Sequence, residues 1–458
     1  MTRRLLAQAV GFLAGTLAAA APAPAHHAPR IDAIRNVHVV DVDRGLVSPA
    51  QTVLISNGRI SHIGPARSVP IRAGAKLLDG AGGFLIPGLI DTHVHLWWGV
   101  KNDQPLYTMF LSPLLSQGIT TVRHAGRTGG DAQGIKAREA AERGTLHTPR
   151  LVISGMVTRR ALPMHGAPNP AALAERLVAI GVDGLKARDG LSLNDVREVI
   201  RIGKRAGLPV YGHPNDGAGR DYSVAAVESG ITGITHVPDL ITRTAAAPGS
   251  AEDWQALWLW RRSVWATMQQ DVQDRLIEAM VKRGVWLEPT LIMDHLVAYD
   301  AEHSAAAERR EPLKDASEAP EGTRTYAEWR EGLPTYRGAD LELYRRTYRN
   351  IQGFVRKFAE AGGNVLAGTD CTPFCGFVQE ELKLLVGAGL SPHKALRAAT
   401  VDAALALRRP DVGQVKVGAR ADLVLLRGNP LDDIRQTENI AAVLLGGSLV
   451  REERRAAE

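Results

Sequence analysis

Between residues 88 and 411, short apolar runs alternate with amphipathic helical stretches, and this alternation constrains the fold more than any other feature of the sequence. Such alternation is typical of parallel sheets, because each parallel strand needs a crossover connection to the next. Eight units in roughly 320 residues predict an α/β protein with a closed (β/α)8 barrel, the TIM-barrel fold, with insertions. The eight expected strands end near His95, Gly126, Gly155, Ala187, His213, His236, Leu291 and Asp370.

Both ends of the chain carry short β-type runs that are cut by glycine and proline turns. The first set lies between residues 31 and 86, and the second contains Ala421–Leu426 and Ile440–Leu445. The two ends of a domain often lie close together in space. We therefore expect residues 26–87 and 412–458 to form one small β-sandwich domain, with the barrel at 88–411.

A helical insertion into the barrel is expected at about residues 240–350, where Ala, Glu, Arg and Trp dominate. Trp254, Trp258 and Trp265 recur at spacings that place them on one face of a helix. Aromatic stripes of this kind usually bury against the body of a protein. The pattern therefore favours packing over a role in a pocket.

The N-terminus has the pattern of an export signal. Arg3–Arg4 precede the apolar run Leu5–Ala21, and Ala23–Ala25 form a small-residue cleavage site. We therefore expect residues 1–25 to be a signal peptide and the mature chain to be periplasmic or secreted. The ordinary secretory route is favoured over the twin-arginine route. No later run reaches 18 apolar residues, so no stable membrane span is expected after processing.

The formal net charge of +6 does not predict a nucleic-acid partner, because the basic residues are scattered among acidic ones. Cys371 and Cys375 are the only cysteines in the sequence, so there is no disulfide framework. In an oxidising compartment these two could bridge a short loop, and two unpaired thiols are an equal alternative.

Two histidines at the end of the first barrel strand indicate a metal site. His93 and His95 follow an apolar run and a Pro-Gly pair. Residues i and i+2 of a strand point to the same face, so both imidazoles can reach one ion from the barrel interior. Paired strand histidines in this setting are a strong signal for metal binding.

Further candidate ligands fall at later strand ends. Lys186 ends the fourth expected strand, His213 the fifth, His236 the sixth and Asp370 the eighth. Polar residues at the carboxyl ends of barrel strands are typical of catalytic sites. The sequence therefore predicts one site that contains six side chains: His93, His95, Lys186, His213, His236 and Asp370.

Several of these segments resemble the amidohydrolase superfamily. The resemblance lies in Pro87–His95, Gly368–Asp370 and Gly418–Val424. Lys186, Gly389–Pro392 and Ala395–Thr400 are similar to the imidazolonepropionase-like and prolidase-like (Xaa-Pro dipeptidase) branch. In prolidase-like members the lysine is carbamylated and bridges two zinc ions, and the resemblance implies the same for Lys186.

The resemblance also implies how the ligands divide between the ions. His93, His95 and Asp370 would hold one divalent ion, expected to be zinc, and His213 and His236 the other. A neutral lysine captures CO₂ to give a carbamate, an anion able to hold two cations. Paired metals lower the pKa of a bridging water and polarise a carbonyl, while Asp370 could accept and return a proton as the catalytic residue.

Residues outside the ligand set have weaker assignments. His165 lies where related enzymes carry a substrate-side His-Gly loop, and Tyr211 on the fifth strand is a second candidate substrate-binding residue. His124 departs from the family, which has an acidic residue at the corresponding position, and its role stays open.

The predicted function is hydrolysis of a C–N bond in a small amide or peptide, such as a dipeptide or an N-acyl amino acid. A mononuclear deaminase and a lactonase of the same superfamily are alternatives, and a deaminase would be expected to carry a glutamate soon after His213. Pro214–Asp216 follow instead. A non-catalytic metal- or solute-binding exported protein is a further alternative. The sequence leaves open whether the protein forms a homo-oligomer.

Overall fold

The computed structural model describes residues 29–96, 111, 113–126, 130–188, 190–213, 220–240, 254–299, 333–370 and 377–452. The predicted signal peptide at 1–25 and both cysteines, Cys371 and Cys375, lie outside these residues. Within the described ranges, no helix has the length and apolar character that crossing a membrane requires.

Eight parallel strands form the larger sheet, and they follow one another in chain order from β5 to β12. Most are short, and their residues are almost entirely buried, as expected of strands covered on both faces. The strands are β5 Leu89–Val94, β6 Ile119–His124, β7 Arg150–Val157, β8 Gly184–Ala187, β9 Val210–Gly212, β10 Gly233–Thr235, β11 Trp286–Glu288 and β12 Asn364–Val365.

Hydrogen bonds connect the two edges of this sheet. Thr92 N in β5 donates to Ala367 O at 3.0 Å, and Asp370 N donates to His93 O at 2.8 Å. The segment after β12 therefore lies beside β5, as a TIM barrel requires. The order of the eight expected strands is confirmed, although β11 ends at Glu288 rather than near Leu291 and β12 ends at Val365 rather than near Asp370.

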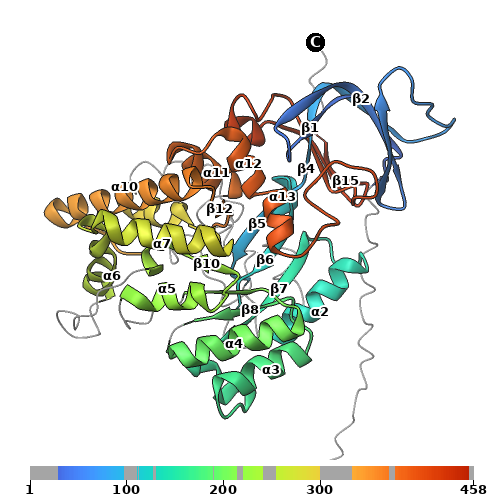
Figure 1. Ribbon diagram of the computed structural model, residues 1–458. Helices are drawn as coiled ribbons and strands as arrows, with labels where there is room; N and C mark the ends of the chain where they lie inside the picture. Colours follow the sequence, from blue (N-terminus) through green and yellow to red (C-terminus); the bar gives the residue numbers. More distant parts are fainter. Residues whose placement is uncertain are drawn as a thin grey trace, which may run out of the picture.

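Helices cover the outside of the curled sheet (Figure 1). Their buried faces join the strands in one large apolar cluster. The helices are α2 Asp131–Glu142, α3 Pro170–Ala179, α4 Leu193–Ala206, α5 Arg220–Glu228, α6 Trp254–Arg262, α7 Gln270–Arg283, α10 Gly338–Glu360, α11 Val378–Gly387, α12 Pro392–Ala398 and α13 Val401–Ala406.

A second sheet is built from both ends of the chain, whose blue and red strands lie together at one end of the molecule in Figure 1. Its strand order is β15-β14-β13-β4-β1-β2-β3. The strands are β1 Ala33–Asp41, β2 Leu46–Ser56, β3 Arg59–Pro65, β4 Leu77–Pro87, β13 Leu423–Leu426, β14 Ile440–Leu445 and β15 Ser448–Glu452.

This second sheet corrects the expectation of a β-sandwich made of two sheets. Strand β4 pairs with β1 on one side and with β13 on the other. It therefore joins the N-terminal and C-terminal strands into one continuous sheet, which packs around its own apolar cluster. The chain then passes from β4 into β5 through Gly88, whose N–H donates to Asp422 O.

The Trp-containing region packs against the barrel. Trp265 is fully buried, and its Nε1 donates to Pro238 O at 3.2 Å. Trp258 Nε1 donates to Tyr344 Oη of α10 at 3.1 Å. The packing role is therefore confirmed for these two residues, while the side chain of Trp254 lies outside the description.

Candidate metal centre

The carboxyl ends of the barrel strands bring all six predicted ligands to one mouth. Lys186 Nζ in β8 lies 3.0 Å from His93 Nε2 in β5. His95 Nε2 lies 3.0 Å from Asp370 Oδ1. The rings of His213, after β9, and His236, after β10, have centroids 4.5 Å apart. Residues separated by as many as 277 positions therefore meet because neighbouring parallel strands end together.

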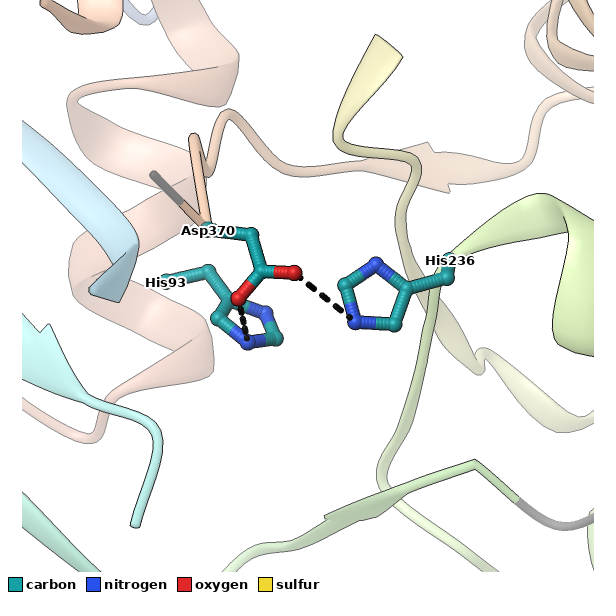
Figure 2. A group of neighbouring side chains, drawn as sticks. All are labelled: His93, His236 and Asp370. Atoms are coloured by element: carbon teal, nitrogen blue, oxygen red, sulfur yellow. Dashed lines mark ion pairs between the residues drawn. The ribbon is translucent and has the colours of Figure 1, made fainter. Parts of the chain in front are cut away.

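Asp370 lies at the centre of this group (Figure 2). One carboxylate oxygen lies 3.3 Å from His93 Nε2, and the other lies 3.5 Å from His236 Nε2. Ligand atoms of these three residues all lie within 4.8 Å of one another. Two imidazoles and a carboxylate this close together suit Zn²⁺ or a similar divalent ion.

Each histidine is oriented by a hydrogen bond from its Nδ1. His93 donates to Glu288 Oε2 at 2.6 Å, and His95 donates to Gly126 O at 2.9 Å. His236 Nδ1 lies 2.6 Å from Thr290 Oγ1, and the Thr290 hydroxyl donates to Pro289 O.

Because the Thr290 hydroxyl proton is donated to Pro289 O, the Thr290 oxygen accepts a hydrogen bond from His236 Nδ1. These hydrogen bonds assign the proton of each ring to Nδ1 and leave Nε2 available as a metal ligand.

His213 gives the clearest sign that something binds here. Its Nδ1 lies 2.8 Å from Asp239 Oδ2, while its Nε2 is buried and has no hydrogen-bond partner among the residues that the structure describes. A buried nitrogen left without a partner is costly unless a ligand satisfies it. The residues present therefore fit a metal ion.

Burial favours the neutral forms of Lys186 and of three of the candidate histidine ligands. It lowers the pKa of His236 to about 3 and holds the pKa of His93 and His213 well below the usual value. Burial likewise lowers the pKa of the Lys186 amine to about 7. Neutral imidazoles bind metals, and a neutral amine is the form that reacts with CO₂.

The backbone is strained at this site. His236, Thr290 and Asp370 have φ values of 64°, 50° and 62°, in the left-handed region that residues other than glycine rarely adopt. Such conformations cost on the order of 1–3 kcal/mol each and tend to cluster at functional sites. Here these conformations direct toward the cluster the side chains of two candidate ligands, His236 and Asp370, and the Thr290 hydroxyl that orients His236.

Sequence reasoning missed two carboxylates that orient the ligands. Glu288 at the end of β11 accepts from His93 and from the buried Arg123, whose Nη2 lies 2.9 and 2.7 Å from its two oxygens. Asp239 lies in the 3₁₀ turn Val237–Leu240. The signal available for Glu288 was a charged residue at a strand end, but the seventh strand was expected to end near Leu291.

The remaining predicted residues lie outside the ligand cluster. His124 accepts a hydrogen bond from Leu96 N at 3.1 Å, so it fixes the backbone that follows His95. Tyr211 is fully buried, and its hydroxyl donates to Ala406 O at 2.7 Å. Because that hydroxyl is engaged inside the barrel, the predicted substrate contact of Tyr211 is wrong. His165 Nε2 lies 3.4 Å from Asp131 Oδ2, and its substrate role stays a prediction.

Eight parallel strands with histidines and an aspartate at one mouth are the arrangement of a metal-dependent barrel enzyme. The model of the Amidohydrolase family matches residues 84–450, and the chain belongs to this family. Imidazolonepropionase from Anaeromyxobacter dehalogenans is 27% identical over 422 residues, which cover 86% of this chain and 88% of the relative.

Solved structures agree on the fold. A putative prolidase from Bifidobacterium longum has a TM-score of 0.67 at 23% identity, covering 93% of this chain and 97% of that one. A Xaa-Pro dipeptidase with bound methionine has a TM-score of 0.65 at 21% identity, covering 91% and 98%. The family match identifies the chain as a hydrolase of C–N bonds, as the sequence predicted. The imidazolonepropionase and prolidase likenesses are those that the predicted branch would show.

Proposed function

We propose that this hydrolase holds two divalent metal ions, with zinc as the expected metal, and cleaves amide bonds in small substrates such as dipeptides or N-acyl amino acids. The observation that carries the proposal is the orientation of four histidines, each with Nδ1 engaged and Nε2 left for a metal, around Lys186 and Asp370. His93, His95 and Asp370 would hold one ion, and His213 and His236 the other.

Lys186 is suited to lie between the two ions as a carbamate. Its side chain is fully buried, and among the described residues no carboxylate forms an ion pair with it. A charged ammonium is costly in such a place, so the neutral amine is favoured. The amine nitrogen would attack CO₂, forming a C–N bond and releasing one proton, and the resulting anion would balance the two cations.

Asp370 would manage protons during hydrolysis. When bound, the two ions would lower the pKa of water and polarise the substrate carbonyl. The Asp370 carboxylate touches three histidine nitrogens and is one-fifth exposed, so it can reach both the cluster and the substrate side. It would accept a proton as the new C–O bond forms and return it to the amine as the C–N bond breaks.

Two other features of the proposal rest on the sequence. The pattern of residues 1–25 supports export, and His165 would contact substrate from the loop after β7. Several relatives are named imidazolonepropionases, two are named adenine deaminases, and two structural neighbours are named as prolidases. A cyclic amide is therefore a useful second substrate to compare with dipeptides.

The test is hydrolysis of a substrate panel by the purified, metal-loaded chain. The panel contains Xaa-Pro and other dipeptides, N-acyl amino acids, imidazolonepropionate, adenine and a lactone. Amide cleavage that falls about 100-fold or more in Asp370→Asn supports the proposal. The control is Asp195→Asn, which changes a carboxylate that pairs with Arg159 away from the cluster. Ammonia release from adenine without amide cleavage would favour the deaminase instead.

A further inference from the structure

We propose that Glu288 and Asp239 are positioning residues, and that each sets the affinity of one of the two metal positions by orienting one histidine. The inference rests on the proposed function, because it requires metal at this site. It concerns two residues that the predicted ligand set does not include.

The hydrogen-bond partners of the four histidines divide into two kinds. His93 and His213 are each held by a carboxylate, from Glu288 and Asp239. His95 and His236 are each held by a neutral oxygen, from a backbone carbonyl and a threonine hydroxyl. In the proposed ligand assignment, each ion therefore receives one histidine of each kind.

A carboxylate partner makes an imidazole a stronger ligand. It fixes the tautomer and ring orientation, and its negative charge raises the basicity of the opposite nitrogen. Removing a partner of this kind typically costs about 10–100-fold in metal affinity. Glu288 and Asp239 should therefore have separable effects, one on each ion.

Glu288 is held rigidly in the barrel interior. Its side chain is 1% exposed, and Arg123 binds both of its oxygens. Arg123 is itself fixed by a hydrogen bond from Nε to Thr92 O at 2.5 Å. The carboxylate that faces His93 can therefore neither turn away nor exchange its partner for water.

Asp239 is held by its backbone. Its N–H donates to His236 O at 3.1 Å. The neighbouring Pro238 O accepts from Trp265 Nε1, and the neighbouring Leu240 O accepts from the Ser223 hydroxyl. The 3₁₀ turn is thus fixed on both sides of Asp239, while its side chain remains 23% exposed.

Asp239 also lies close enough to His213 and His236 to act as a ligand itself. The hydrogen-bond geometry favours the positioning role, because Asp239 occupies His213 Nδ1 and leaves the buried Nε2 facing no other partner. Removing a direct ligand would change the set of atoms around the ion. Removing a positioning residue would change the metal affinity and leave that set of atoms intact.

The experiment measures the two stepwise Zn²⁺ dissociation constants by chelator competition in the full chain. Asp239→Asn and Glu288→Gln should each weaken one constant by about tenfold or more, and the double variant should weaken both. At saturating Co²⁺, the visible absorption spectrum of Asp239→Asn should match the wild type in band position and intensity. A matching spectrum identifies an unchanged ligand set.

Two controls match the two variants. Asp411→Asn removes a carboxylate of similar exposure, 24%, which pairs with Arg409 and Arg420. Asp422→Asn removes a buried carboxylate whose two oxygens are both bound by an arginine, Arg150, as those of Glu288 are bound by Arg123. Neither contacts a proposed ligand, so both should leave the two dissociation constants unchanged.

The outcomes separate the inference from the proposed function. A wild-type chain that binds no ion would overturn the proposed function itself. A wild type with two ions whose constants are unchanged in Asp239→Asn would overturn only the positioning role. An altered Co²⁺ spectrum at saturation would identify Asp239 as a ligand and would likewise overturn its positioning role. If Glu288→Gln fails to fold because Arg123 loses its partner, Asp239→Asn still decides the inference.

Discussion

Gly368 shows how closely the residues of the metal centre pack. A Cβ atom at this position would lie 2.6 Å from His93 Cβ and 3.1 Å from Glu288 Cγ. Real Cβ atoms do not approach this closely, so one of these neighbours would have to move. The glycine therefore allows the segment after β12 to lie against β5 and β11 and brings Asp370 into the cluster.

Gly368→Ala should consequently weaken both folding and metal binding. Overpacking of this kind costs about 1–3 kcal/mol of unfolding free energy, and displacement of His93 should lower metal content. Gly353→Ala in α10 is the control, since a Cβ there meets nothing within 4 Å and alanine favours the helix. Denaturant unfolding and metal analysis of the two variants check the prediction. Equal stability and metal content in both would contradict it.

The cluster of candidate ligands could be predicted from the sequence, but the residues that orient them could not. His93, Lys186 and Asp370 are polar residues at the ends of apolar runs, a pattern visible without a structure. Glu288 and Asp239 contact histidines 195 and 26 residues away through side-chain geometry. That geometry depends on where β11 ends and on a 3₁₀ turn, and local patterning specifies neither precisely.

A buried polar network connects the elements beside the barrel. Asp294, in the helix at residues 291–299, accepts from Arg262 Nε at the end of α6 and from the Tyr344 hydroxyl of α10. Arg262 also lies 3.5 Å above the Trp258 ring. The sequence predicted helices and aromatic packing in this region, but not the Asp294 carboxylate that joins three of them.

Tyr344→Phe should destabilise the protein by about 1–3 kcal/mol, because it leaves Asp294 and Trp258 with fewer partners in a buried site. Tyr348→Phe, one helical turn later, is the matched control. Its hydroxyl is buried and has no hydrogen-bond partner, so its removal should be neutral or slightly stabilising. Thermal unfolding of both variants tests the contrast, and a larger loss in Tyr348→Phe would refute the role given to the network.

On the scale of the whole molecule, two apolar cores are joined by β4 and by ion pairs. Arg150, at the start of β7, binds Asp422 beside β13 through two nitrogens at 2.6 and 2.9 Å. Asp411 pairs with Arg409, after α13, and with Arg420. The backbone of Arg420 forms a β-bridge with Arg59 in β3. The sequence predicted that both chain ends build one small β domain but not which strands pair, because strand pairing across more than 300 residues leaves no local pattern.

The Asp411 contacts predict a pH dependence of stability. Burial alone would raise the pKa of this carboxyl group, but hydrogen bonds from Arg409 and Arg420 outweigh that effect and hold the pKa well below its usual value. A lowered folded-state pKa stabilises the protein fully above the ordinary carboxyl range. The contribution declines as pH falls below that range and is lost as pH passes through the lowered folded-state pKa. Asp411→Asn should therefore cost about 1 kcal/mol at pH 7, after allowance for partial exposure, and less near pH 3.

Urea unfolding of wild type and Asp411→Asn at both pH values checks this prediction. The difference between the two proteins should shrink as the pH is lowered. A difference that stays constant with pH would show that the carboxylate charge does not stabilise this junction.

The central claim is a two-metal site bridged by Lys186, and metal content per chain tests it most directly. Wild type and Lys186→Ala are purified with the same zinc supply, and the account predicts about two ions in the wild type, a sharp fall in the variant and loss of amide hydrolysis. Added acetate should restore part of the metal content, since a small carboxylate can stand in for the carbamate. One ion in both proteins, with hydrolysis retained, would contradict the bridging role and favour a mononuclear enzyme.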